Sequence, residues 1–297
     1  MQIERRSSPA VERKARLRPH LFRLYKAIRN RLAATPLRKV LRVKALQDML
    51  FRRLHPRYAE IEGRKMFLDD DDCMLLSLKG VYEPVTTRFV KEMVRPGDVV
   101  VDIGANIGYY TLLFSELTGP GGKVLAFEPH PANCALLRKN VEANGLANVE
   151  VFERAASNRS GKARLYLDRD GGAMYHSLID LGERTSFLDV DCVRLDDFLA
   201  GREGHLDIIK IDVEGGEGLA LEGMGRILET NRRLRIISEF SPEALRTAGT
   251  EPAEHLRKIQ AMGFEVRALD GTFREIRPSD IEGLLDSYLN LLFTRDR

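Results

Sequence analysis

The feature that most constrains the fold of this chain is a glycine-rich segment that directly follows a β-branched run. Val99–Ile103 is typical of a buried strand, and Asp102-Ile-Gly-Ala-Asn-Ile-Gly108 leads from it into a helix-like stretch over 108–118. A glycine turn in this place lets the backbone approach a ligand closely and points the N–H groups of the helix at it. The segment therefore predicts an α/β protein with a ligand at the end of its first strand.

Strand-like and helix-like stretches alternate after residue 98, which is typical of a parallel sheet with crossover helices. Further strands are expected at 124–127, 149–152, 206–213, 234–240, 264–269 and 288–294. Helices are expected at 131–143, 217–229 and 251–262. Apolar and polar residues alternate over 164–167 and 187–193, which predicts an antiparallel excursion after the third strand.

The glycine segment does not match the usual phosphate-binding motifs. The dinucleotide fingerprint Gly-x-Gly-x-x-Gly fails because Asn106 stands where the second glycine would be, and a pyrophosphate has to lie on that turn. A P-loop fails because the terminal Gly-Lys-Ser/Thr is missing. What remains is a cofactor without phosphate, namely an adenosine joined to a zwitterionic amino acid.

Two other segments suit such a cofactor. Glu128 ends the second expected strand, 24 residues after Gly104, where a carboxylate can accept hydrogen bonds from both ribose hydroxyls. After the third strand, Ala156 and Ser157 leave room for a flat adenine ring. The alternatives are a solvated strand end for Glu128 and a plain turn for the small residues.

Acidic residues gather where the fourth and fifth strands end. Lys210-Ile-Asp-Val-Glu-Gly-Gly-Glu217 places Asp212 and Glu214 on one side of an extended chain, and Glu239 ends the next strand. Carboxylates at the mouth of a pocket are costly unless they bind something, such as the amino group of the cofactor, a metal or a substrate hydroxyl. Helix capping is the alternative. We assign no residue as a metal ligand. His176, in the excursion, could face the reacting oxygen, although a lone loop histidine is more often incidental.

The distribution of charge separates a basic arm from a mildly acidic body. Residues 1–60 hold 17 Lys and Arg against 4 Asp and Glu, and the remainder holds 30 against 40. We expect an arm over 1–64 and a catalytic domain over 65–297. Two amphipathic helices fit the arm, with apolar residues at helical spacing: Leu21, Leu24, Tyr25, Ile28 and Leu32 in the first, and Leu37, Val40, Leu41, Met49 and Leu50 in the second. The arm could meet an anionic membrane or an acidic partner, or it could pack on the body.

Several features favour a location inside the cell. No apolar run reaches the roughly 18–20 residues that span a bilayer, and the N-terminus lacks the apolar core of a secretory signal. Cys73, Cys134 and Cys192 have neither paired nor metal-like spacing. We therefore expect a cytoplasmic protein, with a peripheral position at the inner membrane surface as a further option.

Taken together, these motifs resemble the FkbM family of S-adenosylmethionine-dependent methyltransferases over about residues 65–295. The matching segments are Gly80-Val-Tyr-Glu-Pro84, Val101–Gly108, Phe127-Glu-Pro129, Ala155-Ala-Ser157 with Gly161, Leu195-Asp196 and Lys210–Glu217. The resemblance implies a class I methyltransferase-type fold, a Rossmann-like, doubly wound sheet of seven strands with the last one antiparallel. It also implies that S-adenosylmethionine is bound by Asp102, Gly104, Asn106, Gly108 and Glu128. Asp212 and Glu214 would lie at the reaction centre.

The expected reaction is methyl transfer to a hydroxyl of a sugar, a glycan, a polyketide or another small acceptor. Donor and acceptor must be held in line, and the hydroxyl proton must be removed. The candidate bases are Asp212, Glu214, His176 and Glu239, with Glu214 favoured. One alternative is an RNA methyltransferase that uses the basic arm, but the fourth strand lacks the Asn/Asp-Pro-Pro-aromatic pattern of amino-methylating nucleic-acid enzymes, so nucleic acid is not the expected partner. The other alternative, a non-catalytic cofactor-binding module, leaves the carboxylates unexplained.

Overall fold

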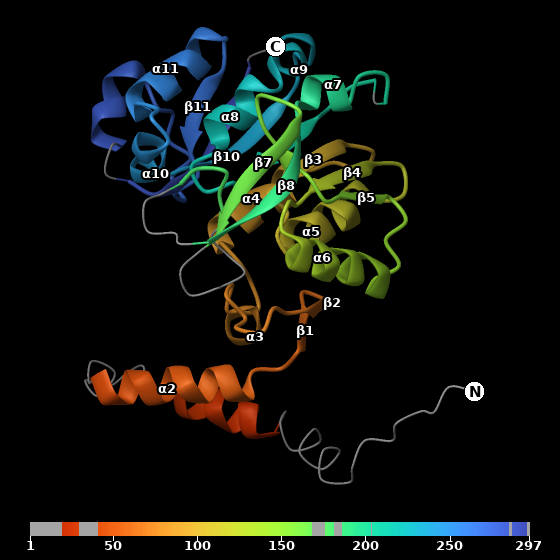
Figure 1. Ribbon diagram of the computed structural model, residues 1–297, viewed down its shortest axis with the longest axis vertical. Helices are drawn as coiled ribbons and strands as arrows, with labels where there is room; N and C mark the ends of the chain where they lie inside the picture. The colour runs from red at the N-terminus through yellow and green to blue at the C-terminus, as the bar shows by residue number, and fades with distance from the viewer. Residues whose placement is uncertain are drawn as a thin grey trace. The chain divides into compact units, whose positions relative to one another are not determined.

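The computed structural model describes residues 20–29, 41–167, 176–180, 186–202, 204–284 and 287–295 (Figure 1). The chain forms two compact units, residues 1–80 and 81–297, and each is described here by itself. The expected domain boundary after residue 64 stays a prediction. None of the helices in the described ranges is both long and apolar enough to cross a membrane.

The first unit is built from short elements around a small aromatic cluster. After a helical segment at 20–29 come α2 (Leu41–Leu54), the antiparallel pair β1 (Tyr58–Ile61) and β2 (Arg64–Phe67), and α3 (Leu76–Lys79). The buried residues of the cluster are Phe22, Tyr25, Phe51 and Leu78.

The two expected helices of the arm are only partly buried. Of the stripe expected in the first helix, Tyr25 is buried, whereas Leu21, Leu24 and Ile28 are 47%, 58% and 50% exposed. Met49 of the second helix is 52% exposed. Leu50 is half-buried. Leu32, Leu37 and Val40 lie outside the described residues, and the side chain of Leu41 is not among those described.

The second unit contains a seven-stranded sheet in the order β11-β12-β10-β9-β3-β4-β5. These strands are Glu265–Ala268, Leu289–Thr294, Arg235–Phe240, Ile208–Ile211, Val99–Ile103, Lys123–Phe127 and Val149–Phe152, respectively. β12 is antiparallel to both of its neighbours, and the other pairs are parallel. This order confirms the Rossmann-like, class I methyltransferase-type fold that the sequence predicts.

Helices cover both faces of this sheet (Figure 1). On one side lie α4 (Pro84–Met93), α5 (Tyr109–Thr118) and α6 (Pro131–Ala143). On the other lie α8 (Glu217–Glu222), α9 (Gly225–Thr230), α10 (Pro242–Thr247) and α11 (Pro252–Ala261). Side chains of this second group form one apolar cluster with buried residues of the central strands. Because β3, β9 and β10 run parallel to one another, their carboxyl ends lie at one edge of the sheet, where ligands bind in folds of this type.

The expected antiparallel excursion is confirmed and is longer than the sequence indicates. β7 (Gly161–Leu167) pairs antiparallel with β8 (Ser186–Val193), and β6 (Ala155–Ala156) adds to β8 in parallel. The short helix α7 (Leu195–Phe198) then leads toward β9.

The single helix expected at 217–229 was a wrong prediction, because the chain forms α8 and α9 with a break between them. Gly223 lies at the break, where an added Cβ would come within 2.0 Å of the carbonyl oxygen of Ser157. The close approach of the Ser157 backbone therefore requires glycine at this position. The helix α10 was not expected from the sequence either.

Candidate active site

The turn after β3 lies directly against the loop after β9. Gly104 has φ +77°, and a Cβ built on it would come within 1.8 Å of the carbonyl oxygen of Asp212. The backbone N–H of Asp212 donates to the carbonyl of Ile103 at 3.0 Å. Only glycine fits such a contact, so Gly104 brings the predicted cofactor turn and the predicted reaction centre together. At the other end of the turn, Gly108 has φ +97° and packs against Leu137 of α6.

Glu128 joins the turn after β3 to the turn after β4. One of its carboxylate oxygens accepts from the backbone N–H of Asn106 at 2.9 Å, and the other accepts from that of His130 at 2.8 Å. The residue is 4% exposed, and this burial raises the pKa of its carboxyl to about 7. A carboxylate has about four acceptor positions, so Glu128 retains capacity for ligand hydroxyls.

Asp102 lies beneath the glycine turn and is 1% exposed. Oδ2 accepts from the hydroxyl of Thr111 at 2.6 Å, and Oδ1 has no hydrogen-bond partner among the described residues. Burial raises the pKa of this carboxyl, although the charge of Lys210 and the bond from Thr111 oppose the shift. An orphaned buried acceptor is costly and suits a ligand that carries a donor.

The two small residues predicted to contact adenine are both buried. Ala156 belongs to β6 and to the apolar cluster on the sheet. Ser157 is 3% exposed, and its backbone N–H donates to the carbonyl of Val193 at 2.9 Å. Their contact with adenine stays a prediction.

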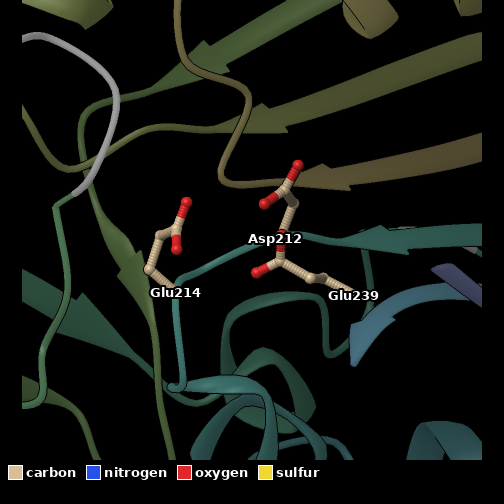
Figure 2. Close-up of side chains that lie close together, drawn as sticks. All are labelled: Asp212, Glu214 and Glu239. Atoms are coloured by element: carbon tan, nitrogen blue, oxygen red, sulfur yellow. The ribbon is translucent and has the colours of Figure 1, made fainter. Parts of the chain in front are cut away.

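Three carboxylates meet where β9 and β10 end. Asp212 and Glu214 follow β9, Glu239 belongs to β10, and each offers an oxygen within 4.8 Å of those of the others. Figure 2 shows the three side chains turned toward one another. Burial, with the charges of Asp212 and Glu214, raises the pKa of Glu239 well above its ordinary value. The sequence predicted these carboxylates at the ends of neighbouring strands, and the structure brings them together.

Asp212 and Glu239 are each contacted on one oxygen by a neighbouring polar side chain. The ammonium of Lys210, 2% exposed, lies 2.8 Å from Oδ2 of Asp212. Burial alone would lower the pKa of Lys210, but the charges of Asp212 and Asp102 outweigh it and raise that pKa. The hydroxyl of Tyr288 donates to Oε1 of Glu239, while Oε2 of Glu239 has no hydrogen-bond partner in the part of the chain that is described.

His176 lies between the end of β4 and the loop after β9. Its ring stacks on that of His130, with centroids 4.3 Å apart and an interplanar angle of 24°. The hydroxyl of the next residue, Ser177, donates to the carbonyl of Glu214 at 2.7 Å. The excursion thus reaches the carboxylate cluster through Ser177. A role for His176 as the base stays a prediction.

Sequence reasoning missed several residues around the cluster. The hydroxyl of Tyr110 donates to Glu83 at 2.7 Å, and the Lys210 ammonium lies 4.6 Å from the Tyr110 ring centroid. Burial and nearby carboxylates raise the pKa values of Tyr82 and Tyr288. The segment Gly80-Val-Tyr-Glu-Pro84 was a signal for Tyr82 and Glu83, but no motif pointed to Tyr288.

Comparison with known proteins gives a consistent family. A family model described as the methyltransferase FkbM domain matches residues 102–266. The 31-O-demethyl-FK506 methyltransferase FkbM of Streptomyces tacrolimicus is 33% identical over 195 residues, which cover 61% of this chain and 70% of that protein. Methyltransferase 1 of Beauveria bassiana is 28% identical over 144 residues, which cover 42% of this chain and 57% of that protein.

Solved structures also match. The crystal structure of a SAM-dependent O-methyltransferase from Thermotoga maritima aligns with a TM-score of 0.40 at 16% identity, covering 73% of this chain and 67% of that one.

Proposed function

The chain belongs to the FkbM methyltransferase family and is an S-adenosylmethionine-dependent methyltransferase, and we propose that it methylates a hydroxyl oxygen of a sugar, a glycan, a polyketide or another small molecule. The observation that carries this proposal is the cluster of Asp212, Glu214 and Glu239 beside the glycine turn. Carboxylates at that place can receive the proton that a hydroxyl must lose. The name of the relative from Streptomyces tacrolimicus gives 31-O-demethyl-FK506 as its acceptor, which supports an oxygen acceptor here.

The residues around the turn fit the cofactor. When bound, S-adenosylmethionine supplies an electrophilic methyl group on its sulfonium. Glu128, with acceptor capacity left, would hold the ribose hydroxyls, and the orphaned Oδ1 of Asp102 suits a donor of the amino-acid part. Gly104, Asn106 and Gly108 shape the turn. No Lys or Arg occurs in residues 102–108, which agrees with a ligand that has no phosphate.

Ala156 and Ser157 would lie beside the adenine. Both residues are small and follow the end of β5, the strand next to β4 in the sheet. A short side chain there leaves space for a flat ring, and the Ser157 hydroxyl can address its edge.

Glu214 is the carboxylate that we propose as the base. Asp212 shares one oxygen with the Lys210 ammonium, and Glu239 is buried and accepts the Tyr288 hydroxyl. Glu214 is less buried than Glu239, so an acceptor can reach it more easily. Asp212 would instead hold the amino group of the cofactor, because it lies against the turn at Gly104.

The test of methyl transfer is a product assay with radiolabelled S-adenosylmethionine. Glycan, lipid, small-molecule and RNA fractions are incubated with the full chain, and labelled products are identified by mass spectrometry. We expect an O-methyl group on a glycan or small-molecule hydroxyl. Label that enters only RNA would contradict the proposal and favour the alternative acceptor class.

The roles of Glu214 and Asp212 are tested by two isosteric variants. Glu214→Gln should slow turnover by roughly 10²–10⁴-fold, the usual range for a positioned acid or base, and should leave cofactor binding intact. Asp212→Asn should instead weaken cofactor binding. Single-turnover rates and cofactor titrations separate these effects. A Glu214→Gln enzyme that works at the wild-type rate would move the base to His176 or Glu239.

The N-terminal unit suggests where the enzyme works. We propose that residues 1–60 hold it on the cytoplasmic, anionic surface of a membrane, because this segment is strongly basic. Leu21, Leu24 and Ile28 are each about half exposed. Exposed apolar side chains beside Lys and Arg are the combination that binds a helix to an anionic lipid surface.

A further inference from the structure

We propose that Asp212, Glu214 and Glu239 together bind one divalent cation of the Mg²⁺, Mn²⁺ or Ca²⁺ class. Each side chain offers an oxygen within 4.8 Å of the oxygens of the other two, and Figure 2 shows the carboxylates converging from the ends of β9 and β10. Three carboxylates this close repel one another when they are ionised and cannot hydrogen-bond to one another, because each is then only an acceptor. A cation between them would offset this repulsion.

A second observation comes from Glu239. The residue is 5% exposed, and its Oε2 is buried without any hydrogen-bond partner among the described residues. Its Oε1 already accepts the hydroxyl of Tyr288, which fixes the direction of the carboxylate. Buried polar atoms normally have a partner, and one without it points to an ion or ligand. The atom that lacks a partner therefore belongs to the carboxylate that projects into the cluster from β10.

Asp212 is held in a comparable way. The buried ammonium of Lys210 lies 2.8 Å from Oδ2, and the described contacts leave Oδ1 for a ligand. Metal-binding carboxylates are commonly oriented by hydrogen bonds on their other oxygen. Lys210 and Tyr288 give Asp212 and Glu239 this outer support, so both carboxylates are oriented before a cation binds.

The donor set selects the class of cation. All three ligands are oxygens, and in the described structure neither His nor Cys belongs to the group. Oxygen ligands favour hard cations over zinc or copper. Ligand oxygens lie about 2.0–2.1 Å from Mg²⁺ and about 2.3–2.6 Å from Ca²⁺. Three oxygens that lie within 4.8 Å of one another need only small side-chain adjustments to reach either ion.

The consequence for catalysis rests on the proposed function. A divalent cation at the end of β9 and β10 would orient the acceptor hydroxyl and lower its pKa. With a cation bound, Asp212 and Glu214 would act as one site. Glu214→Gln and Asp212→Asn should then both remove the dependence of turnover on metal, in place of the separate effects expected for a site without a cation. Cation binding itself does not depend on the identity of the acceptor.

The binding of Mn²⁺ to the full chain tests the site without acceptor or cofactor. The electron paramagnetic resonance signal of free Mn²⁺ measures binding, and Mg²⁺ and Ca²⁺ are added as competitors. We expect one saturable site with a dissociation constant at or below ~1 mM, the weak end of the range for protein Ca²⁺ sites. Glu239→Gln and Glu214→Gln should each weaken it at least tenfold, and Glu229→Gln, an exposed site on α9, should leave it unchanged.

Circular dichroism establishes which variants fold, and Glu214, which is less buried, provides the second variant if Glu239→Gln does not fold. No saturable binding to the wild-type chain up to ~1 mM would overturn the cation site. Binding that either folded variant leaves unchanged would overturn it as well. Because the measurement uses no methyl acceptor, a chain that binds Mn²⁺ but methylates no hydroxyl would refute the proposed function alone.

Discussion

Replacing Glu128 with alanine is the most direct test of the cofactor site. The carboxylate is 4% exposed and holds the backbone N–H groups of Asn106 and His130 at 2.9 and 2.8 Å. The proposed ribose contacts would use the acceptor positions that these two bonds leave. Glu128→Ala should therefore remove ligand contacts and loosen the two turns that frame the ligand.

The size of the effect follows from the type of hydrogen bond. A hydrogen bond to a charged group contributes about 1.5–3 kcal/mol. Because about 1.4 kcal/mol corresponds to a tenfold change, losing one ribose bond should raise the dissociation constant of S-adenosylhomocysteine by roughly 10- to 150-fold. The N–H groups of Asn106 and His130 also lose their acceptor, at about 1–3 kcal/mol each if water does not replace it. The free energy of unfolding should fall as well.

Isothermal titration calorimetry with S-adenosylhomocysteine measures the binding loss, and thermal unfolding measures the loss of stability. Glu142→Ala is a matched control, because Glu142 is exposed on α6. It should change neither quantity appreciably. If Glu128→Ala changes the dissociation constant less than about threefold, about 0.7 kcal/mol, Glu128 only stabilises the turns and the ribose assignment is wrong.

Three further predictions concern pH, the glycine turn and the arm. Burial raises the pKa of Glu128 from 4.5 to about 7, so S-adenosylhomocysteine affinity should rise with pH, by up to about tenfold per unit below pH 7. The free protein should lose stability between about pH 4.5 and 7, where this carboxyl is ionised in the unfolded chain but still protonated in the fold. Glu128→Gln should flatten the binding profile. Gly104→Ala would place a Cβ within 1.8 Å of the Asp212 carbonyl and should weaken ligand binding more than tenfold. Gly145→Ala is the control, because Gly145 shares the positive φ (+64°) but has no atom within 4 Å of its Cβ; it should retain binding even where it lowers stability. Equal loss of ligand affinity in the two variants would contradict the close approach. Deleting residues 1–60 should abolish sedimentation with anionic vesicles but preserve cofactor affinity. Raising the salt concentration should release the full chain, because the Debye screening length falls to about 8 Å near physiological ionic strength. Sedimentation that salt does not change would argue against an electrostatic contact.

The fold was predictable from the sequence because its central strands are buried on both faces. Such strands are rich in β-branched residues, as in Val99–Ile103, and the glycines after them mark where the chain must turn. Once the strands are placed, parallel pairing brings their carboxyl ends to one edge. This rule is the reason that Glu239 could be assigned to the same rim as Asp212, although the two lie on different strands.

Other parts of the site depend on contacts between distant residues, which periodicity does not encode. Tyr288 reaches Glu239 across 49 positions of the chain. At the break between α8 and α9, the Ser157 backbone leaves no room for a Cβ at Gly223. In the arm, helical spacing correctly indicated two helices, but it could not distinguish Tyr25, which is buried, from Leu24, which is 58% exposed.

The motif Lys210–Glu217 contains residues that stabilise the loop after β9 and residues that belong to the carboxylate cluster. Oε1 of Glu217 accepts the backbone N–H groups of Val213 and Gly215 at 3.1 and 3.3 Å. These bonds span Glu214, whose φ of 52° is unusual for a residue with a side chain. Glu217 is 1% exposed, so it acts on the loop and does not meet an acceptor directly. The last carboxylate of the motif therefore stabilises the strained turn that presents Glu214 beside Asp212, and its effect on chemistry passes through the position of Glu214.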